Sequence, residues 1–147
     1  MKVSVYQHVE SEVLNEEFMR RLEEKWSALA GELVELGGGV IAGLEAVEMS
    51  LVDDPTITQV HGDFMNDPTP TDVITFQHGE ILLSVETAQR QAKEFGTQAQ
   101  WEVALYGVHG LLHLSGYDDQ TAEDFEKMRV RQEELASALF PELRLES

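Results

Sequence analysis

The chain of 147 residues contains no cysteine. Disulfide bridges and thiolate metal ligands are therefore excluded, and the composition fits a reducing compartment. The opening residues MKVSVYQHVE lack the apolar segment of a secretory signal, and no apolar run reaches the roughly 18 residues that a membrane-spanning helix requires. We therefore expect a cytoplasmic protein with no membrane contact.

Positively charged residues are also scarce. The chain has 10 lysines and arginines against 28 aspartates and glutamates, which gives a formal net charge of −18 at pH 7. A field of this sign repels phosphate backbones at long range. The charge therefore argues against nonspecific binding of nucleic acid, and any nucleic-acid substrate must be recognised through local features.

The length and the hydrophobic content of 42% predict a single globular domain over residues 1–147. Apolar–polar patterning predicts four strands, at 2–9, 46–52, 72–76 and 79–86. Apolar residues at helical spacing predict five helices, at 14–36, 54–65, 86–96, 99–116 and 121–139. This order predicts an α+β fold, in which a small four-stranded mixed sheet packs with about five helices.

Residue types at the helix ends and along one helix face refine these predictions. Asn15 is the expected N-cap of the first long helix, and Asp54, followed by Pro55, is the expected N-cap of the second. Four apolar residues are expected on the inner face of the last helix: Phe125, Met128, Leu135 and Leu139.

The stretch VHGLLHLSGYDD, residues 108–119, carries the main chemical signal. His109 and His113 are four residues apart, so a helix presents both imidazoles on one face, as in the metal helix of zincin proteases. Gly116 is suited to end this helix with a left-handed turn, which would bring Asp118 or Asp119 back toward the same point. Two imidazoles and one oxygen ligand leave a fourth position open for water, which is the catalytic form of a zinc site.

The same residues resemble a known family signature. HGLLHLSGYDD is similar to H-G-x-L-H-L-x-G-Y-D-H, the signature of the YbeY family of metal-dependent endoribonucleases, which are rRNA maturation factors. PTPTDVITF resembles the family's P-T-D-V-L-S-F strand. GEILLSVETAQRQAKEFG resembles its G-D-I-x-I strand and the helix that follows. The resemblance covers roughly residues 64–119.

The resemblance implies a zinc ion held by three histidines in a cleft beside the sheet, with metal-bound water as the nucleophile. It implies cleavage of single-stranded RNA in rRNA maturation and ribosome quality control, with rRNA and the small ribosomal subunit or its proteins as partners. His109 and His113 match the family ligands, and the third ligand falls on Asp119, where the family has histidine. Asp118 is expected to orient a histidine or cap the last helix. The alternative, with Asp118 as ligand and Asp119 as cap, stays open.

A second departure concerns the phosphate group of the substrate. The family usually has an arginine after an aromatic residue, and the matching positions here are Phe64 and Met65. A guanidinium at this position would clamp a phosphate. Arg90 and Lys93 are the nearest cations that could compensate, although a solvated helix face explains them better. The alternative function is therefore a ribosome-associated assembly factor with little or no catalysis.

The general base is not evident from the sequence. Proteases of the H-E-x-x-H type carry glutamate directly after the first histidine, and this chain has Gly110 there, which disfavours a metallopeptidase. The acidic candidates for a base near the sheet edge are Asp72, Glu80 and Glu86, and Asp72 is also expected to line the cleft. The isolated histidines are expected outside the site: His8, His61 and His78.

Overall fold

The computed structural model describes residues 1–69 and 71–143. Pro70, part of the PTDV motif, lies outside the described residues. The elements follow the predicted order: β1 (Lys2–Gln7), α1 (Glu16–Leu36), β2 (Ala46–Val52), α2 (Asp54–Met65), β3 (Val73–Phe76), β4 (Glu80–Ser84), α3 (Val85–Phe95), α4 (Ala99–Leu114) and α5 (Ala122–Leu139). Two short 3-10 helices, Ile41–Gly43 and Pro141–Leu143, complete them. The predicted α+β class with a four-stranded mixed sheet is confirmed.

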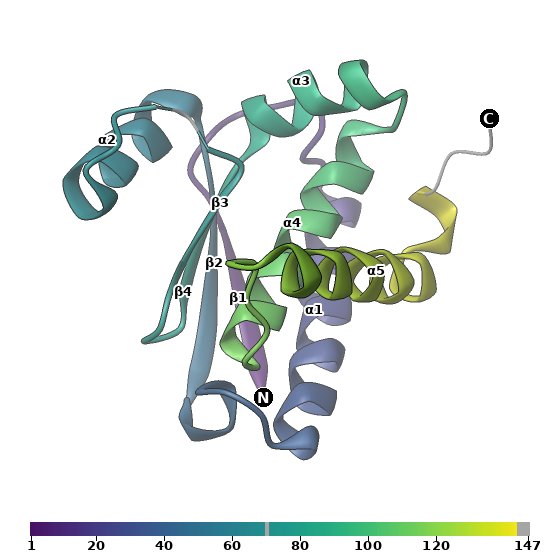
Figure 1. Cartoon of the computed structure of the whole chain (residues 1–147). Helices are drawn as coiled ribbons and strands as arrows, with labels where there is room; N and C mark the ends of the chain where they lie inside the picture. The colour runs from purple at the N-terminus through teal and green to yellow at the C-terminus, as the bar shows by residue number, and fades with distance from the viewer. Residues whose placement is uncertain (70, 144–147) are drawn as a thin grey trace.

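The strands lie in the order β1-β2-β4-β3 (Figure 1). β1 pairs with β2 and β2 with β4 in parallel, whereas β3 pairs antiparallel with β4 and forms one edge of the sheet. The β3–β4 hairpin turns at Gly79, whose φ of 104° suits glycine and not a residue with a side chain. Helix α4 packs against both strands of this hairpin.

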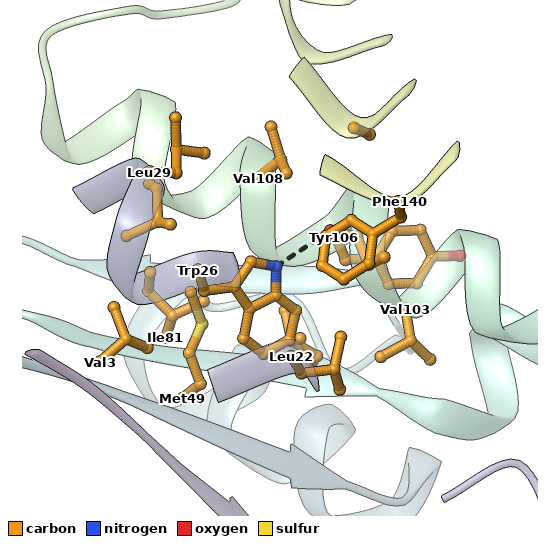
Figure 2. Packing of buried hydrophobic residues seen from close by; sticks show 14 of the residues in the cluster. Val3, Leu22, Trp26, Leu29, Met49, Ile81, Val103, Tyr106, Val108 and Phe140 are labelled. Atoms are coloured by element: carbon orange, nitrogen blue, oxygen red, sulfur yellow. Dashed lines mark hydrogen bonds between the residues drawn. The ribbon is translucent and has the colours of Figure 1, made fainter. Parts of the chain in front are cut away.

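Helices α1 and α4 cover one face of the sheet and enclose the main core (Figure 1). Figure 2 shows Trp26 of α1 among buried side chains of the strands and helices, and its indole N–H donates to the carbonyl of Ala104 in α4 at 3.2 Å. On the other face, α2 covers a smaller cluster of four buried residues: Val52, Ile57, Ile74 and Leu82.

Glycines in α4 allow this helix to lie close to its neighbours. A Cβ on Gly107 would stand 2.2 Å from the Trp26 ring, and a Cβ on Gly110 would stand 2.9 Å from the Ile81 side chain and 3.3 Å from the Thr75 hydroxyl. Real Cβ atoms do not make contacts of 2.2 or 2.9 Å. The absence of side chains at both positions therefore sets α4 directly against α1 and the β3–β4 edge.

The structure corrects three details of the sequence-based elements. The N-cap of α2 is Asp53, whose side chain accepts from the Thr56 N–H at 2.9 Å, so Asp54 is the first helical residue. β4 ends at Ser84, because that serine caps α3. Phe125 is 54% exposed and does not belong to the inner face of α5. The N-cap at Asn15 is confirmed.

The other expected inner-face residues of α5 do face the core. Met128 and Leu135 are buried, and Leu139 packs against the core while partly exposed. Within the described residues, the structure contains no helix long and apolar enough to cross a membrane.

Candidate metal centre

The last two turns of α4 bring the two histidines of the motif together. The Nε2 atoms of His109 and His113 are 3.1 Å apart, and their rings stand edge to face with centroids 4.7 Å apart. Both side chains are half-buried. The spacing of four residues on a helix accounts for this geometry.

The other nitrogen of each ring is held by an oxygen atom. The Nδ1 atom of His109 is 2.7 Å from the Gln132 side-chain oxygen, and the Nδ1 atom of His113 is 3.1 Å from the Tyr117 carbonyl oxygen. These oxygens accept hydrogen bonds, so each Nδ1 carries the proton and donates it. The two Nε2 lone pairs then face one another, which is an unfavourable arrangement unless a cation lies between them.

A tight turn after α4 delivers the third residue. Gly116 adopts a φ of 104°, and the N–H of Tyr117 donates to the Leu112 carbonyl at 3.1 Å. The chain returns so that the Asp119 carboxylate lies 3.8 Å from His113 Nε2. The ligand atoms of His109, His113 and Asp119 lie within 4.8 Å of one another, as a single metal ion requires.

The loop between α1 and β2 packs against this turn. The Val40 N–H donates to the Leu114 carbonyl at 2.9 Å. Gly39, with φ of 67°, lies so close to the turn that an added Cβ would be 2.4 Å from the Leu114 carbonyl oxygen. The glycine run at 37–39 therefore does more than end α1, because it also supports the backbone that carries Asp119.

The electrostatics of the group favour metal binding. Burial, and secondly the neighbouring His109, lower the pKa of His113, although Asp119 acts in the opposite direction. His113 is therefore neutral at physiological pH, as a metal ligand must be. Two imidazoles and one carboxylate form a donor set that suits zinc.

The other acidic residues considered from the sequence have hydrogen-bond or ion-pair partners outside the group of His109, His113 and Asp119. Asp118 is exposed, and its carboxylate accepts from the Gln120 N–H at 3.3 Å, so it holds the local turn and does not join the group. Asp72 accepts from the Val73 N–H at 2.8 Å at the start of β3. Of the other base candidates, the Glu80 carboxylate lies 3.5 Å from His78 Nε2, and Glu86 accepts from the Asp54 N–H.

Arg90, one of the two cations considered for phosphate binding, is engaged by other side chains. The Arg90 guanidinium is bound to Asp54 and to the Thr87 hydroxyl between α2 and α3. Phe64 and Met65, at the family's aromatic–arginine position, are 69% and 50% exposed. None of the isolated histidines joins the metal-binding group: His8, His61 and His78.

Sequence reasoning missed Gln132, the acceptor for His109. A signal was present, because Gln132 is four residues after Met128 and four before Ala136, two buried residues on the inner face of α5. A polar residue in a buried stripe needs a hydrogen-bond partner. The partner on α4 could be found only once the packing of the two helices was known.

Two imidazoles and a carboxylate gathered beside the edge of an α+β sheet are typical of metal-dependent hydrolases with an open coordination position. The chain belongs to the YbeY family of endoribonucleases, because the family model described as Endoribonuclease YbeY matches residues 5–139.

Individual relatives agree with this assignment. The chain is 33% identical over 140 residues to Endoribonuclease YbeY of Symbiobacterium thermophilum, covering 84% of this chain and 90% of the relative. It is 30% identical to Endoribonuclease YbeY of Bacillus cereus strain B4264, covering 88% and 91%. The solution structure of TM1509 from Thermotoga maritima has the same fold, with a TM-score of 0.67 and 23% identity over 95% of this chain and 90% of that one.

Proposed function

We propose that this protein is a zinc-dependent endoribonuclease that cleaves single-stranded RNA in the cytoplasm during rRNA maturation and ribosome quality control. The convergence of His109, His113 and Asp119 is the observation that carries the proposal. Membership of an endoribonuclease family supports RNA as the substrate. The proposed partners are rRNA and the small ribosomal subunit or its proteins.

The roles of the three residues follow from their chemistry. His109 and His113 would hold zinc through Nε2, because each Nδ1 is already donating to an oxygen. Asp119 would supply one carboxylate oxygen and neutralise one unit of the ion's charge. Bound zinc would supply the Lewis acidity that makes water a nucleophile near neutral pH.

A metallopeptidase is disfavoured by the orientation of Gly110 as well as by its identity. The glutamate that zincin proteases use as a base would replace Gly110, but this position faces Ile81 and Thr75 of the sheet. A side chain there would point into the core and not toward the two histidines. The path of α4 therefore disfavours this form of protease chemistry.

The alternative of an assembly factor with weak catalysis rests on Met65 and on the net charge of −18. The comparisons favour the enzyme, because the relatives are named endoribonucleases. A measurement of RNA cleavage would distinguish the enzyme from the assembly factor.

The test is cleavage of single-stranded RNA at low salt by zinc-loaded protein, compared with His113→Ala. We expect cleavage by the wild type and a loss of at least about 100-fold in the variant, because the proposed reaction depends on the bound metal. His78→Ala is a suitable control, since His78 lies in the β3–β4 turn outside the group. Fully loaded wild-type protein that leaves the RNA intact would contradict the proposed activity.

A further inference from the structure

The geometry points to Gln132 as the positioning residue that fixes the tautomer and the orientation of His109. This inference rests on the proposed metal site and adds a residue from α5 to it. Gln132 would not touch the metal or the RNA. It would act only through the imidazole of His109.

The position of Gln132 on α5 determines where its side chain can go. Met128 and Ala136, one turn before and one turn after it, are 1% and 0% exposed and pack in the main core. These two anchors hold the face of α5 that carries Gln132 against α4. The amide is half-buried there, so losing its partner would leave a polar group poorly solvated.

The hydrogen bond selects one tautomer of His109. The Gln132 oxygen lies 2.7 Å from Nδ1, and an amide oxygen can only accept, so the proton stays on Nδ1. The lone pair is then on Nε2, which is the nitrogen directed at His113 Nε2. Without this acceptor, the proton can move to Nε2 and the ring can rotate, and both changes remove the ligand atom from the group.

An amide at position 132, in place of a carboxylate, also affects the net charge around the metal ion. Zinc with His109, His113 and Asp119 carries a net charge of +1. A carboxylate in place of Gln132 would hold the same proton but bring a second negative charge close to the ion. The neutral amide orients the histidine without further reducing the ion's ability to attract electrons.

The test uses two substitutions of Gln132 and one control substitution elsewhere. Gln132→Leu removes the acceptor at similar size, and Gln132→Glu keeps an acceptor. Gln91→Leu is the matched control, because the Gln91 oxygen accepts from the Tyr106 hydroxyl and so also links a neighbouring helix to α4, but outside the metal-binding group. Thermal unfolding of each variant would show that all are folded.

Two measurements decide the outcome. In metal-free protein, long-range ¹H–¹⁵N NMR should show His109 with its proton on Nδ1 in the wild type and in Gln132→Glu, and a mixture of tautomers in Gln132→Leu. By competition with a chelator, zinc affinity should fall about 10- to 100-fold in Gln132→Leu and change by less than about threefold in Gln132→Glu and Gln91→Leu.

The inference fails if wild-type His109 carries its proton on Nε2, or if Gln132→Leu binds zinc as tightly as the wild type. It also fails if Gln91→Leu weakens zinc binding as much as Gln132→Leu, because the effect would then be general loosening of α4. Absence of zinc binding in the wild type would overturn the proposed function, and the NMR measurement on metal-free protein would still decide the role of Gln132.

Discussion

Asp119 is the one acidic member of the proposed metal-binding group, at the position where the signature that the chain resembles has histidine. Its side chain is 41% exposed, and its carboxylate approaches His113 from the turn after α4. A carboxylate ligand would neutralise one unit of the ion's charge, so the ion would acidify bound water less than with a neutral imidazole in its place. The substitution therefore bears on reactivity more than on the ability to hold the ion.

Replacing Asp119 by histidine tests this role. We expect Asp119→His to retain zinc and to reach half of its maximal RNA cleavage at a lower pH, because a third neutral ligand leaves more charge on the ion. A pH–rate profile of the two proteins at full zinc occupancy provides the measurement. An unchanged profile would show that the identity of the third ligand does not control the reaction.

Glu102 of α4 is a buried acid that the proposed reaction does not use. It is 3% exposed, and burial raises the pKa of its carboxyl; Thr97 acts in the opposite direction, and Asp72 and Glu133 raise the pKa slightly further. The folded protein therefore binds this proton more tightly than the unfolded chain does. Stability is then lost as the pH rises from the usual range of a glutamate through the raised pKa.

Glu102→Gln should remove this pH dependence. The free energy of unfolding should equal that of the wild type at acidic pH and exceed it at neutral pH, because the glutamine never ionises. Chemical denaturation at the two pH values measures the difference, with the exposed Glu134→Gln as the control. Lower stability of Glu102→Gln than of the wild type at neutral pH would mean that the charged form is favoured in the fold.

At the scale of elements, the sequence predicted what depends on local pattern. The order of strands and helices and the shared face of His109 and His113 followed from periodicity. The support of the Asp119 turn by Gly39 was missed, since it joins segments about 75 residues apart, from roughly 39 to 115. The exposure of Phe125 was also missed, because helical spacing does not show how far along α5 the contact with α4 extends.

The contact between Gly39 and the turn can be tested by comparing two glycines. Gly37 and Gly39 both have positive φ, but an added Cβ would meet nothing within 4 Å at Gly37 and backbone at 2.4 Å at Gly39. Either alanine substitution should cost about 1–2 kcal/mol of stability for the left-handed backbone, and Gly39→Ala should cost more because its Cβ would meet backbone atoms. Only Gly39→Ala should also weaken zinc binding, measured by competition with a chelator. Equal zinc affinity in the two variants would contradict the supporting role of this loop.

At the scale of the whole molecule, the net charge of −18 opposes RNA binding. Repulsion between the protein and the phosphate backbone is long-ranged and is reduced by salt. Arg90 is engaged with Asp54, and Met65 lies at the position where the resemblance in the sequence led us to expect an arginine. Binding through phosphate contacts is therefore expected to be weak.

Met65→Arg should strengthen RNA binding and increase cleavage at low salt. One added phosphate contact should steepen the dependence of log affinity on log salt by about one unit. Phe95→Arg, at an exposed apolar residue at the end of α3, adds the same charge elsewhere and is the matched control. An equal gain in both variants would mean that net charge, and not a clamp at residue 65, limits the activity.

The most direct test of the account is the zinc content of the purified protein beside His109→Ala and Asp119→Ala, measured by elemental analysis. We predict one zinc ion per wild-type chain and a large loss in both variants, because each substitution removes one of the three proposed ligands. Full retention of zinc in both variants would contradict the assignment of the site.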